Sequence, residues 1–306
     1  MTTGVVLMTY GAPRTLDEVG AYLARVRGRE PAAALVSEFR ERYRRIGMSP
    51  IVRITEAQAR GVGELLGAEY RVVAAMRYSE PSIARRVSEL ANYALDVVVG
   101  MVLSPQWSPL IMSGYEIALR DALAAARPGT PAVMAHEWHR EPAFLEDLAT
   151  AVQDARAALP PDTAILFTAH SLPRRVFDAE PAYVASLRET ADLVAARAGL
   201  AEREWRWAYQ SAGHTQEEWL RPDLKELFPS FAAEGRRDVL VVPVQFLADH
   251  LEVLYDLDVA AAEEARTAGL HYHRVAMPNT RPSLLAALAN VVRREIGAAT
   301  PAAPIA

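Results

Sequence analysis

One histidine and one acidic segment provide the strongest chemical signal in the sequence. His170 directly follows an apolar run, and Glu252 lies in the segment 249–258, which holds four carboxylates and a second imidazole. Imidazole and carboxylate groups accept protons near neutral pH and bind divalent cations through nitrogen and oxygen. A lone histidine is more often a hydrogen-bonded structural residue. The acidic segment shifts the interpretation towards proton transfer or transient metal binding.

The acids of this segment follow helical spacing. Glu252 and Asp256 are four residues apart, so on a helix they would share one face, where like charges repel. A solvated polar face of a helix explains such a pair of acids about as well as a functional site does. At the mouth of a sheet, a path for cations or protons is the better explanation, because neighbouring negative charges raise carboxylate pKa values. Ala260 ends the acidic series at the next position of the same spacing.

Two further pairs of histidines have spacings compatible with metal binding. His271 and His273 alternate on an expected strand, where two exposed edge histidines are the favoured interpretation. His136 and His139 follow another expected strand, and no third ligand is in register with them. Structural roles are therefore favoured for both pairs, with metal binding kept as the alternative.

Arginines suggest a second kind of site. Arg27, Arg29 and Arg77 lie at the ends of expected elements. Their guanidinium groups could bind carboxylates or phosphates, and simple exposure to solvent explains them equally well. Arg40, Arg42 and Arg44 are better explained as the solvated face of a helix.

Alternating strand and helix patterns predict the elements that position these residues. Short β-branched runs alternate with amphipathic stretches, which is typical of an α/β fold with a mainly parallel sheet. Two series of four strands predict an N-terminal domain over 1–160 and a C-terminal domain over 161–306, with the last helix, 283–296, a candidate to pack on the first domain. The expected strands are 4–8, 71–76, 97–103, 132–135, 164–168, 205–209, 238–244 and 271–276.

Two helix starts are also predicted. Thr15 and Glu18 have the spacing of a capping box before a helix that runs to about Arg27, and a second capped helix is expected near Thr55. Ligands of open α/β sheets bind beyond the carboxyl ends of the strands, which directs attention to the residues just after each strand. These positions are Tyr10, Arg77, Gln106, Trp107, His136, His170, Gln210, Ser211 and 245–258.

Composition excludes several classes of function. The formal charge of −5 argues against nucleic acid as a partner, and the absence of cysteine excludes thiolate catalysis and cysteine-held iron–sulfur clusters. No dinucleotide-binding, Walker or nucleophile-elbow motif occurs. The longest apolar run, 97–103, is too short to span a bilayer, and the start of the chain does not resemble a signal peptide. We therefore expect a cytoplasmic protein with no integral membrane association.

Ordered motifs along the chain resemble the ferrochelatases, and most closely their short coproporphyrin type. The motifs are LMTYGAP, RVRGREP, RYRRIGMSPI, AMRYSEPSI, SPQWSPLIMSGY, TAHSLP, YQSAGHTQEEWLRP, VVPVQFLADHLEVLYDLD and MPNTRPSL. The resemblance implies two similar Rossmann-like domains with four-stranded sheets and no bound nucleotide. It also implies insertion of Fe²⁺ into a porphyrin held in the cleft between them.

The resemblance assigns roles to the metal-side residues. His170 is similar to the catalytic histidine of the family and Glu252 to its partner carboxylate on the opposite wall. Asp256 resembles the next acid on a helix that in the family contains a π-type widening, and Ala260 replaces an acid there. Tyr10 resembles the tyrosine that faces the metal from the other side of the macrocycle. The expected metal ligands are His170, Glu252, Tyr10 and Asp256.

The resemblance also implies which residues contact the substrate. Besides Tyr10, the positions that match contacts to porphyrin propionates are Arg27, Arg29, Ser49, Arg77 and Tyr115. Val26 replaces a basic residue of some relatives. The resemblance implies Fe²⁺ as substrate, no tightly bound cofactor and no iron–sulfur cluster.

Three alternatives stay open at this point. They are a protoporphyrin IX ferrochelatase, a chelatase that inserts cobalt or nickel into another tetrapyrrole, and a porphyrin-binding protein without catalysis. The presence of both His170 and Glu252 argues against the last, because binding alone requires no matched proton acceptors. The expected partners are porphyrin, Fe²⁺ and, transiently, neighbouring enzymes of the heme pathway, with the chain itself a monomer.

Overall fold

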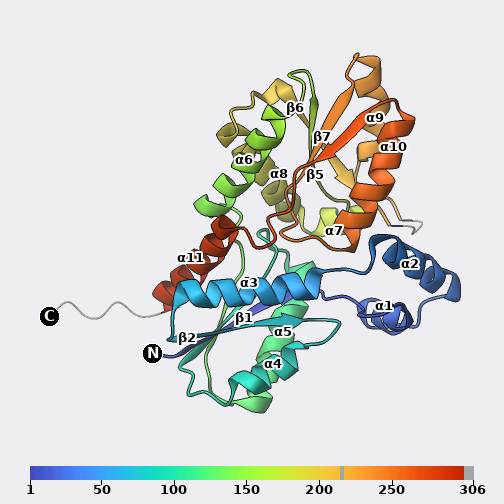
Figure 1. Cartoon of the computed structure of the whole chain (residues 1–306). Helices are drawn as coiled ribbons and strands as arrows, with labels where there is room; N and C mark the ends of the chain where they lie inside the picture. The colour runs from blue at the N-terminus through green and yellow to red at the C-terminus, as the bar shows by residue number, and fades with distance from the viewer. Residues whose placement is uncertain (214–216, 300–306) are drawn as a thin grey trace. The chain divides into compact units, whose positions relative to one another are not determined.

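The computed structural model describes residues 1–213 and 217–299 and divides the chain into two compact units. Among the described residues, the first unit comprises 1–41, 48–141 and 279–299. The second comprises 42–47 and 142–278. Short loops join the strands and helices of each unit in alternation (Figure 1).

Each unit is built on a four-stranded parallel sheet. The order is β2-β1-β3-β4 in the first and β6-β5-β7-β8 in the second, so both sheets have the same topology. Most strand residues are buried and many are β-branched, as expected of parallel strands covered on both faces. The predicted α/β class is confirmed, and the eight predicted strands have ends within two residues of the observed ones. The strands are β1 (Thr3–Thr9), β2 (Tyr70–Met76), β3 (Val97–Val102), β4 (Ala132–Ala135), β5 (Ala164–His170), β6 (Trp205–Gln210), β7 (Asp238–Pro243) and β8 (His271–Arg274).

Helices cover both faces of the first sheet. In this unit α3 packs with α11 against one face, and α4 packs with α5 against the other (Figure 1). The helical segments from here are η1 (Leu16–Glu18), α1 (Val19–Arg27), α2 (Ala33–Ile46), α3 (Ile51–Leu66), α4 (Ile83–Leu90), α5 (Pro109–Ala126) and α11 (Pro282–Ala299).

The second sheet is covered in a similar way. Helix α6 packs with α8 on one side, and α9, α10 and the π-helix η3 pack on the other (Figure 1). Within residues 1–213 and 217–299, no helix has the length and apolar character needed to cross a membrane. The segments of this unit are α6 (Pro142–Ala157), α7 (Arg174–Ala179), α8 (Pro181–Arg197), η2 (Glu202–Glu204), α9 (Leu224–Ala233), η3 (Glu252–Ala261) and α10 (Ala262–Thr267).

The units differ from the predicted boundary at residue 160. Helix α6 belongs to the second unit because it packs on α8 and β7, so the division falls between Glu141 and Pro142. The last helix, α11, belongs to the first unit, where it contacts α3, β3 and β4.

The predicted helix starts need correction as well. Thr15 makes no capping hydrogen bond, and the Glu18 carboxylate accepts from the backbone N–H of Arg14 at 2.8 Å instead. Helix α3 begins at Ile51, so Thr55 lies inside it, with its hydroxyl donating to the Ile51 carbonyl at 2.8 Å. Hydroxyl residues satisfy backbone carbonyls within helices as well as N–H groups at helix starts, and the sequence pattern does not separate the two.

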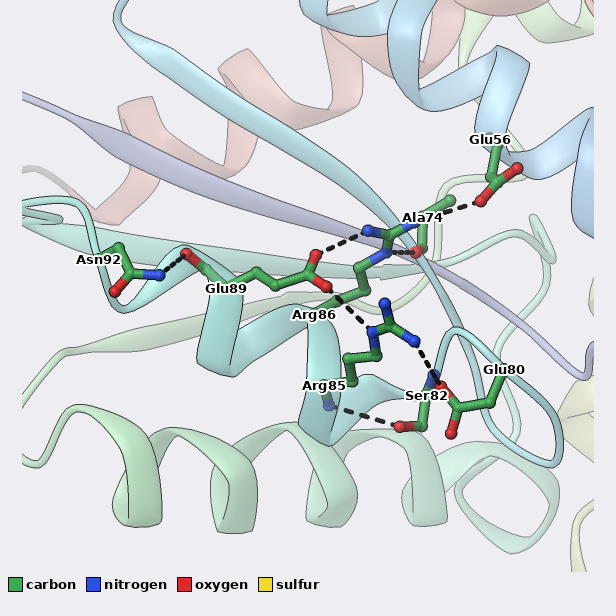
Figure 2. A network of polar contacts seen from close by, with 8 residues as sticks. All are labelled: Glu56, Ala74, Glu80, Ser82, Arg85, Arg86, Glu89 and Asn92. Carbon is green, nitrogen blue, oxygen red and sulfur yellow. Dashed lines mark hydrogen bonds and ion pairs between the residues drawn. The ribbon is translucent and has the colours of Figure 1, made fainter.

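A network of charged side chains protects the outer edge of the first sheet. Strand β2 is an edge strand, and the Arg86 guanidinium donates to the outward-facing carbonyl of Ala74 at 3.1 Å (Figure 2). Glu56 and Glu89 hold the same guanidinium at 3.2 Å and 2.6 Å. An unpaired strand edge is a template for unwanted pairing, so this arginine blocks part of it.

Candidate functional site

The imidazole of His170 is oriented by the backbone of the next residue. His170 is the last residue of β5, and its Nδ1 lies 2.5 Å from the carbonyl oxygen of Ser171. A carbonyl can only accept, so Nδ1 carries the proton, and in the neutral ring the lone pair is on Nε2. This Nε2 lies 3.9 Å from Oε1 of Glu252. Both residues belong to the second unit.

Glu252 begins the π-helix η3. One side of η3 is anchored in the core through Val253, Leu257 and Ala261, which are all buried. Glu252 and Asp256 are also four residues apart, so they lie along the helix beside this buried row. π-helical segments are rare and frequent at functional sites, and this one agrees with the π-type widening implied by the resemblance.

His250 lies in the acidic segment singled out by the sequence, but no role was predicted for it. Its Nδ1 lies 2.9 Å from the carbonyl oxygen of Ala248, and its Nε2 lies 3.5 Å from Oε2 of Glu252. The carboxylate of Glu252 thus has one imidazole near each oxygen. The available signal was the His-x-Glu spacing immediately before an acidic helix.

The charge state of Glu252 follows from these neighbours. Burial would raise its pKa, but the nearby charges of His170 and His250 lower it to about 2. Burial likewise opposes the charge of His250, whose pKa is nevertheless raised by Glu252 and by the Ala248 carbonyl. The expectation that neighbouring acids raise the pKa of Glu252 is therefore wrong, because the two imidazoles outweigh burial and lower it.

Asp256 behaves as the sequence predicted. Burial raises its pKa, and the charge of Glu252 adds to this effect. Arg42 acts in the opposite direction, with its Nη1 3.4 Å from Oδ1 of Asp256. The Arg42 guanidinium also lies over the ring of Tyr255, 5.1 Å from its centroid. Arg42 is mostly buried in this contact, so its assignment to a solvated helix face is wrong.

The residues proposed for the substrate side form a cluster in the first unit. The Tyr10 ring packs against Tyr78 and Tyr115 with centroids 5.0 Å and 6.2 Å apart. The Arg77 guanidinium lies over the same two rings, about equally close to both at 4.9 Å and 5.0 Å. Tyr10 is 44% exposed and Tyr115 is buried, so Tyr115 supports Tyr10 and Arg77 rather than presenting its own surface.

Gly114 on α5 leaves the space that Arg77 occupies. A Cβ atom at this position would lie 1.9 Å from Nη2 of Arg77, far inside van der Waals contact. The absence of a side chain at Gly114 therefore allows the stacked position of the guanidinium.

The other predicted substrate contacts are more exposed. Arg27 ends α1, and Arg29 follows the left-handed Gly28. Neither arginine has an ion-pair or hydrogen-bond partner among the described residues. The Ser49 hydroxyl lies 3.4 Å from the backbone N–H of Ile51, at the start of α3.

The remaining histidine pairs lie beside carboxylates. His136 Nε2 lies 3.1 Å from Glu116 Oε2, and buried His139 lies 3.3 Å from Glu137. His271 and His273 share one oxygen of Asp238, at 3.2 Å and 2.9 Å. Over residues 1–213 and 217–299, no three His, Asp or Glu side chains are grouped so as to hold a metal ion. The structural interpretation of these histidines is therefore favoured.

Comparison with known proteins decides the family. A sequence model described as Ferrochelatase matches residues 2–296. The chain belongs to the ferrochelatase family. This ferrochelatase-family chain is 36% identical to the coproporphyrin III ferrochelatase of Geobacillus kaustophilus over 304 residues, which is 95% of each chain. It is 35% identical to the ferrochelatase of Deinococcus radiodurans, again with 95% of each chain covered.

Solved structures agree with the fold of a ferrochelatase-family protein. SirB from Bacillus subtilis superposes with a TM-score of 0.58 at 13% identity, covering 96% of both chains. CbiX, a terminal enzyme of siroheme biosynthesis, gives 0.56 at 16% identity, covering 96% of this chain and 99% of its own. At these identities the similarity concerns the fold.

Proposed function

We propose that this ferrochelatase-family chain inserts Fe²⁺ into coproporphyrin III to give coproheme in heme biosynthesis. The observation that carries the proposal is the site at the end of β5, where the Nε2 lone pair of His170 faces the Glu252 carboxylate at 3.9 Å. Family membership and the relatives named coproporphyrin III ferrochelatase support the reaction class.

Proton removal is the first task of such a site. Metalation replaces two pyrrole N–H protons with one divalent ion, so two protons leave as Fe²⁺ enters. The Nε2 lone pair of His170 is a suitable acceptor for one proton at a time, and each proton must pass on to solvent before Nε2 accepts the next or binds the metal. Glu252, whose pKa is low, stays a carboxylate and stabilises the imidazolium that forms. His170 is thus the catalytic base and Glu252 its electrostatic partner.

Transient iron binding is the second task. With zinc as a guide, metal bonds are about 2.0–2.1 Å to imidazole nitrogen and about 2.0–2.2 Å to carboxylate oxygen, so two donors of the same ion, one of each kind, are at most about 4.3 Å apart. The 3.9 Å between His170 Nε2 and Glu252 Oε1 is within that limit. Nitrogen and oxygen donors release Fe²⁺ more readily than a thiolate cage does. We assign Asp256 to the supply of the ion.

The first unit supplies the proposed porphyrin contacts. Tyr10 is assigned to the bound iron product, as a phenolate ligand after insertion. Arg27 and Arg29, which lack partners among the described residues, and Arg77 are assigned to propionates, since guanidinium groups bind carboxylates strongly. Ser49 is assigned a hydrogen bond to a propionate, and Tyr115 supports Tyr10 and Arg77 from beneath.

Several properties complete the proposal. The chain has no cysteine, so an iron–sulfur cluster held by thiolates has no ligands. We propose that the protein acts in the cytoplasm as a monomer, without a tightly bound cofactor, with porphyrin and Fe²⁺ as substrates. Transient contact with neighbouring enzymes of the pathway is part of the same proposal.

One assay tests the function. The purified protein is incubated anaerobically with Fe²⁺ and either coproporphyrin III or protoporphyrin IX, and metalation is followed by absorbance. Parallel reactions contain Co²⁺ or Ni²⁺. Iron insertion that is faster with coproporphyrin supports the proposal. Equal rates with both porphyrins would support ferrochelatase activity but contradict coproporphyrin III as the preferred substrate. Binding of porphyrin without metalation would contradict an enzymatic function.

A further inference from the structure

Strand β7 leaves the second sheet before its neighbour β5 ends. The two strands pair up to Thr168 and Pro243, and Val244 N–H still donates to the Thr168 carbonyl at 3.0 Å. Alternate residues of a strand direct their backbone groups to the same side, so the N–H of His170 also faces β7. At that position the backbone of β7 has already turned away. The N–H of His170 needs another acceptor.

The side chain of Gln245 takes the place of the missing strand. Its Oε1 accepts from the backbone N–H of His170 at 2.9 Å. A backbone N–H can only donate, which identifies the amide atom as oxygen and leaves Nε2 as the donor. This Nε2 donates to the hydroxyl of Tyr183 at 2.8 Å. Tyr183 lies on α8 and is 2% exposed, so the amide is attached to a rigid part of the core.

The next peptide is held from the opposite side. The N–H of Ser171 donates to the Gln210 carbonyl on β6 at 2.8 Å, and the Ser171 carbonyl holds Nδ1 of His170. His170 is therefore fixed between β6 and Gln245, and only its Nε2 is directed at Glu252.

We infer that Gln245 is a positioning residue for iron insertion, acting through His170 by extending the ladder of β5 beyond the end of β7. The inference rests on the proposed function of His170 as the base. Gln245 hydrogen-bonds the backbone of His170, and its effect is on the distance between Nε2 and the reacting proton. A displacement of about 1 Å at a reacting group costs up to about 10²-fold in rate.

Three variants test this inference. Gln245→Met keeps the length of the side chain and removes both hydrogen bonds. Tyr183→Phe removes only the outer bond. Gln153→Met is the matched control, because its amide bonds the Arg197 carbonyl at 3.2 Å elsewhere in the same unit.

A role in positioning predicts a specific kinetic pattern. We expect Gln245→Met to lower kcat about tenfold with little change in KM for the porphyrin, Tyr183→Phe to lower it less, and the control to leave both unchanged. In a His170→Ala background, Gln245→Met should cost nothing further, because residues that act through one another are not additive. An unchanged kcat, or the same loss in both backgrounds, would overturn the inference.

A second measurement is independent of turnover. Histidine ring resonances observed by NMR should shift for His170 in Gln245→Met and stay unchanged for His271. An unmoved His170 signal would refute the inference even in an active enzyme. If the unmodified protein inserts no iron but Gln245→Met still shifts the His170 signal, the proposed function is contradicted and the positioning role stands.

Discussion

Oε2 of Glu252 lies 3.5 Å from Nε2 of His250, while its other oxygen faces His170. The two imidazoles are not equivalent. That of His250 has a raised pKa, because the Ala248 carbonyl and the Glu252 carboxylate both favour the protonated ring. The two oxygens of Glu252 therefore face different rings, Oε2 that of His250 and Oε1 that of His170.

Removing either member of the pair should abolish most of the activity. We expect His170→Ala and Glu252→Gln each to lower the rate of iron insertion by about 10²-fold or more, the usual contribution of a general base. Porphyrin binding, measured by fluorescence, should remain. An equal loss of binding and turnover would mark the pair as structural.

Glu252 should also influence stability in acid. Its pKa falls to about 2 on folding, from about 4.3 in an unfolded chain. A lowered carboxylate pKa stabilises the fold above the unfolded value, and this contribution is lost as the pH falls towards the folded value. Urea midpoints should therefore fall less steeply below a pH of about 4.3 in Glu252→Gln than in the unmodified protein. The exposed Glu146→Gln on α6 is the control and should retain the steep fall.

Replacement of Gly114 by alanine should be tolerated less well than the same change at other glycines within helices. In a helix interior the change usually stabilises by about 0.5–1 kcal/mol. Here the new methyl would displace Arg77. We expect Gly114→Ala to raise KM for coproporphyrin and to give no gain in Tm. Gly20→Ala, whose Cβ would meet only Val36 at 3.6 Å, should leave KM unchanged, and a matching rise in KM there would remove Arg77 from the explanation.

Arg27 should contribute to the choice of porphyrin. Coproporphyrin has four propionates and protoporphyrin two, and one contact of about 1.4 kcal/mol corresponds to a tenfold preference. Arg27→Ala should lower kcat/KM for coproporphyrin about tenfold and leave protoporphyrin nearly unchanged. The exposed Arg60→Ala on α3 is the control. Equal losses on both porphyrins would contradict a propionate contact.

Arg86 should matter more for stability than its neighbour Arg85. Arg86→Met removes the donor from the Ala74 carbonyl, which costs about 1–3 kcal/mol for a buried acceptor. Arg85 is 61% exposed and pairs with Glu80 and Glu89 (Figure 2), so its loss should cost about 0–1 kcal/mol. Urea unfolding of both variants measures the difference, and equal losses would show that the edge contact adds nothing.

The fold was predictable because its signal is local. The run Gly4–Met8 and the segment 238–244 are apolar and β-branched over the length of a strand, and such runs identify buried parallel strands without knowledge of their neighbours. The boundary at 160 was wrong because α6 has an apolar face of ordinary appearance. Which sheet that face covers depends on contacts with α8 and β7, which lie later in the chain.

The site was predictable by residue type and only partly by geometry. His170 and Glu252 could be selected from their positions after strands. The role of Arg42 could not, because its partner Asp256 is 214 residues away. The low pKa of Glu252 could not be predicted for a similar reason, since sequence spacing reveals the acids beside it and hides the imidazole of His170, which comes from strand β5.

The two units are interleaved along the chain, which has a consequence for synthesis. Residues 42–47 belong to the second unit, and their contacts with Asp256 and Glu263 involve residues more than 200 positions later. At about 5–20 residues per second, the ribosome takes roughly 10–40 s to deliver those partners. Helix α11, which completes the first unit, is made after every residue of the second unit. The first unit therefore cannot finish folding until the whole of the second has been made, although each has a sheet of its own.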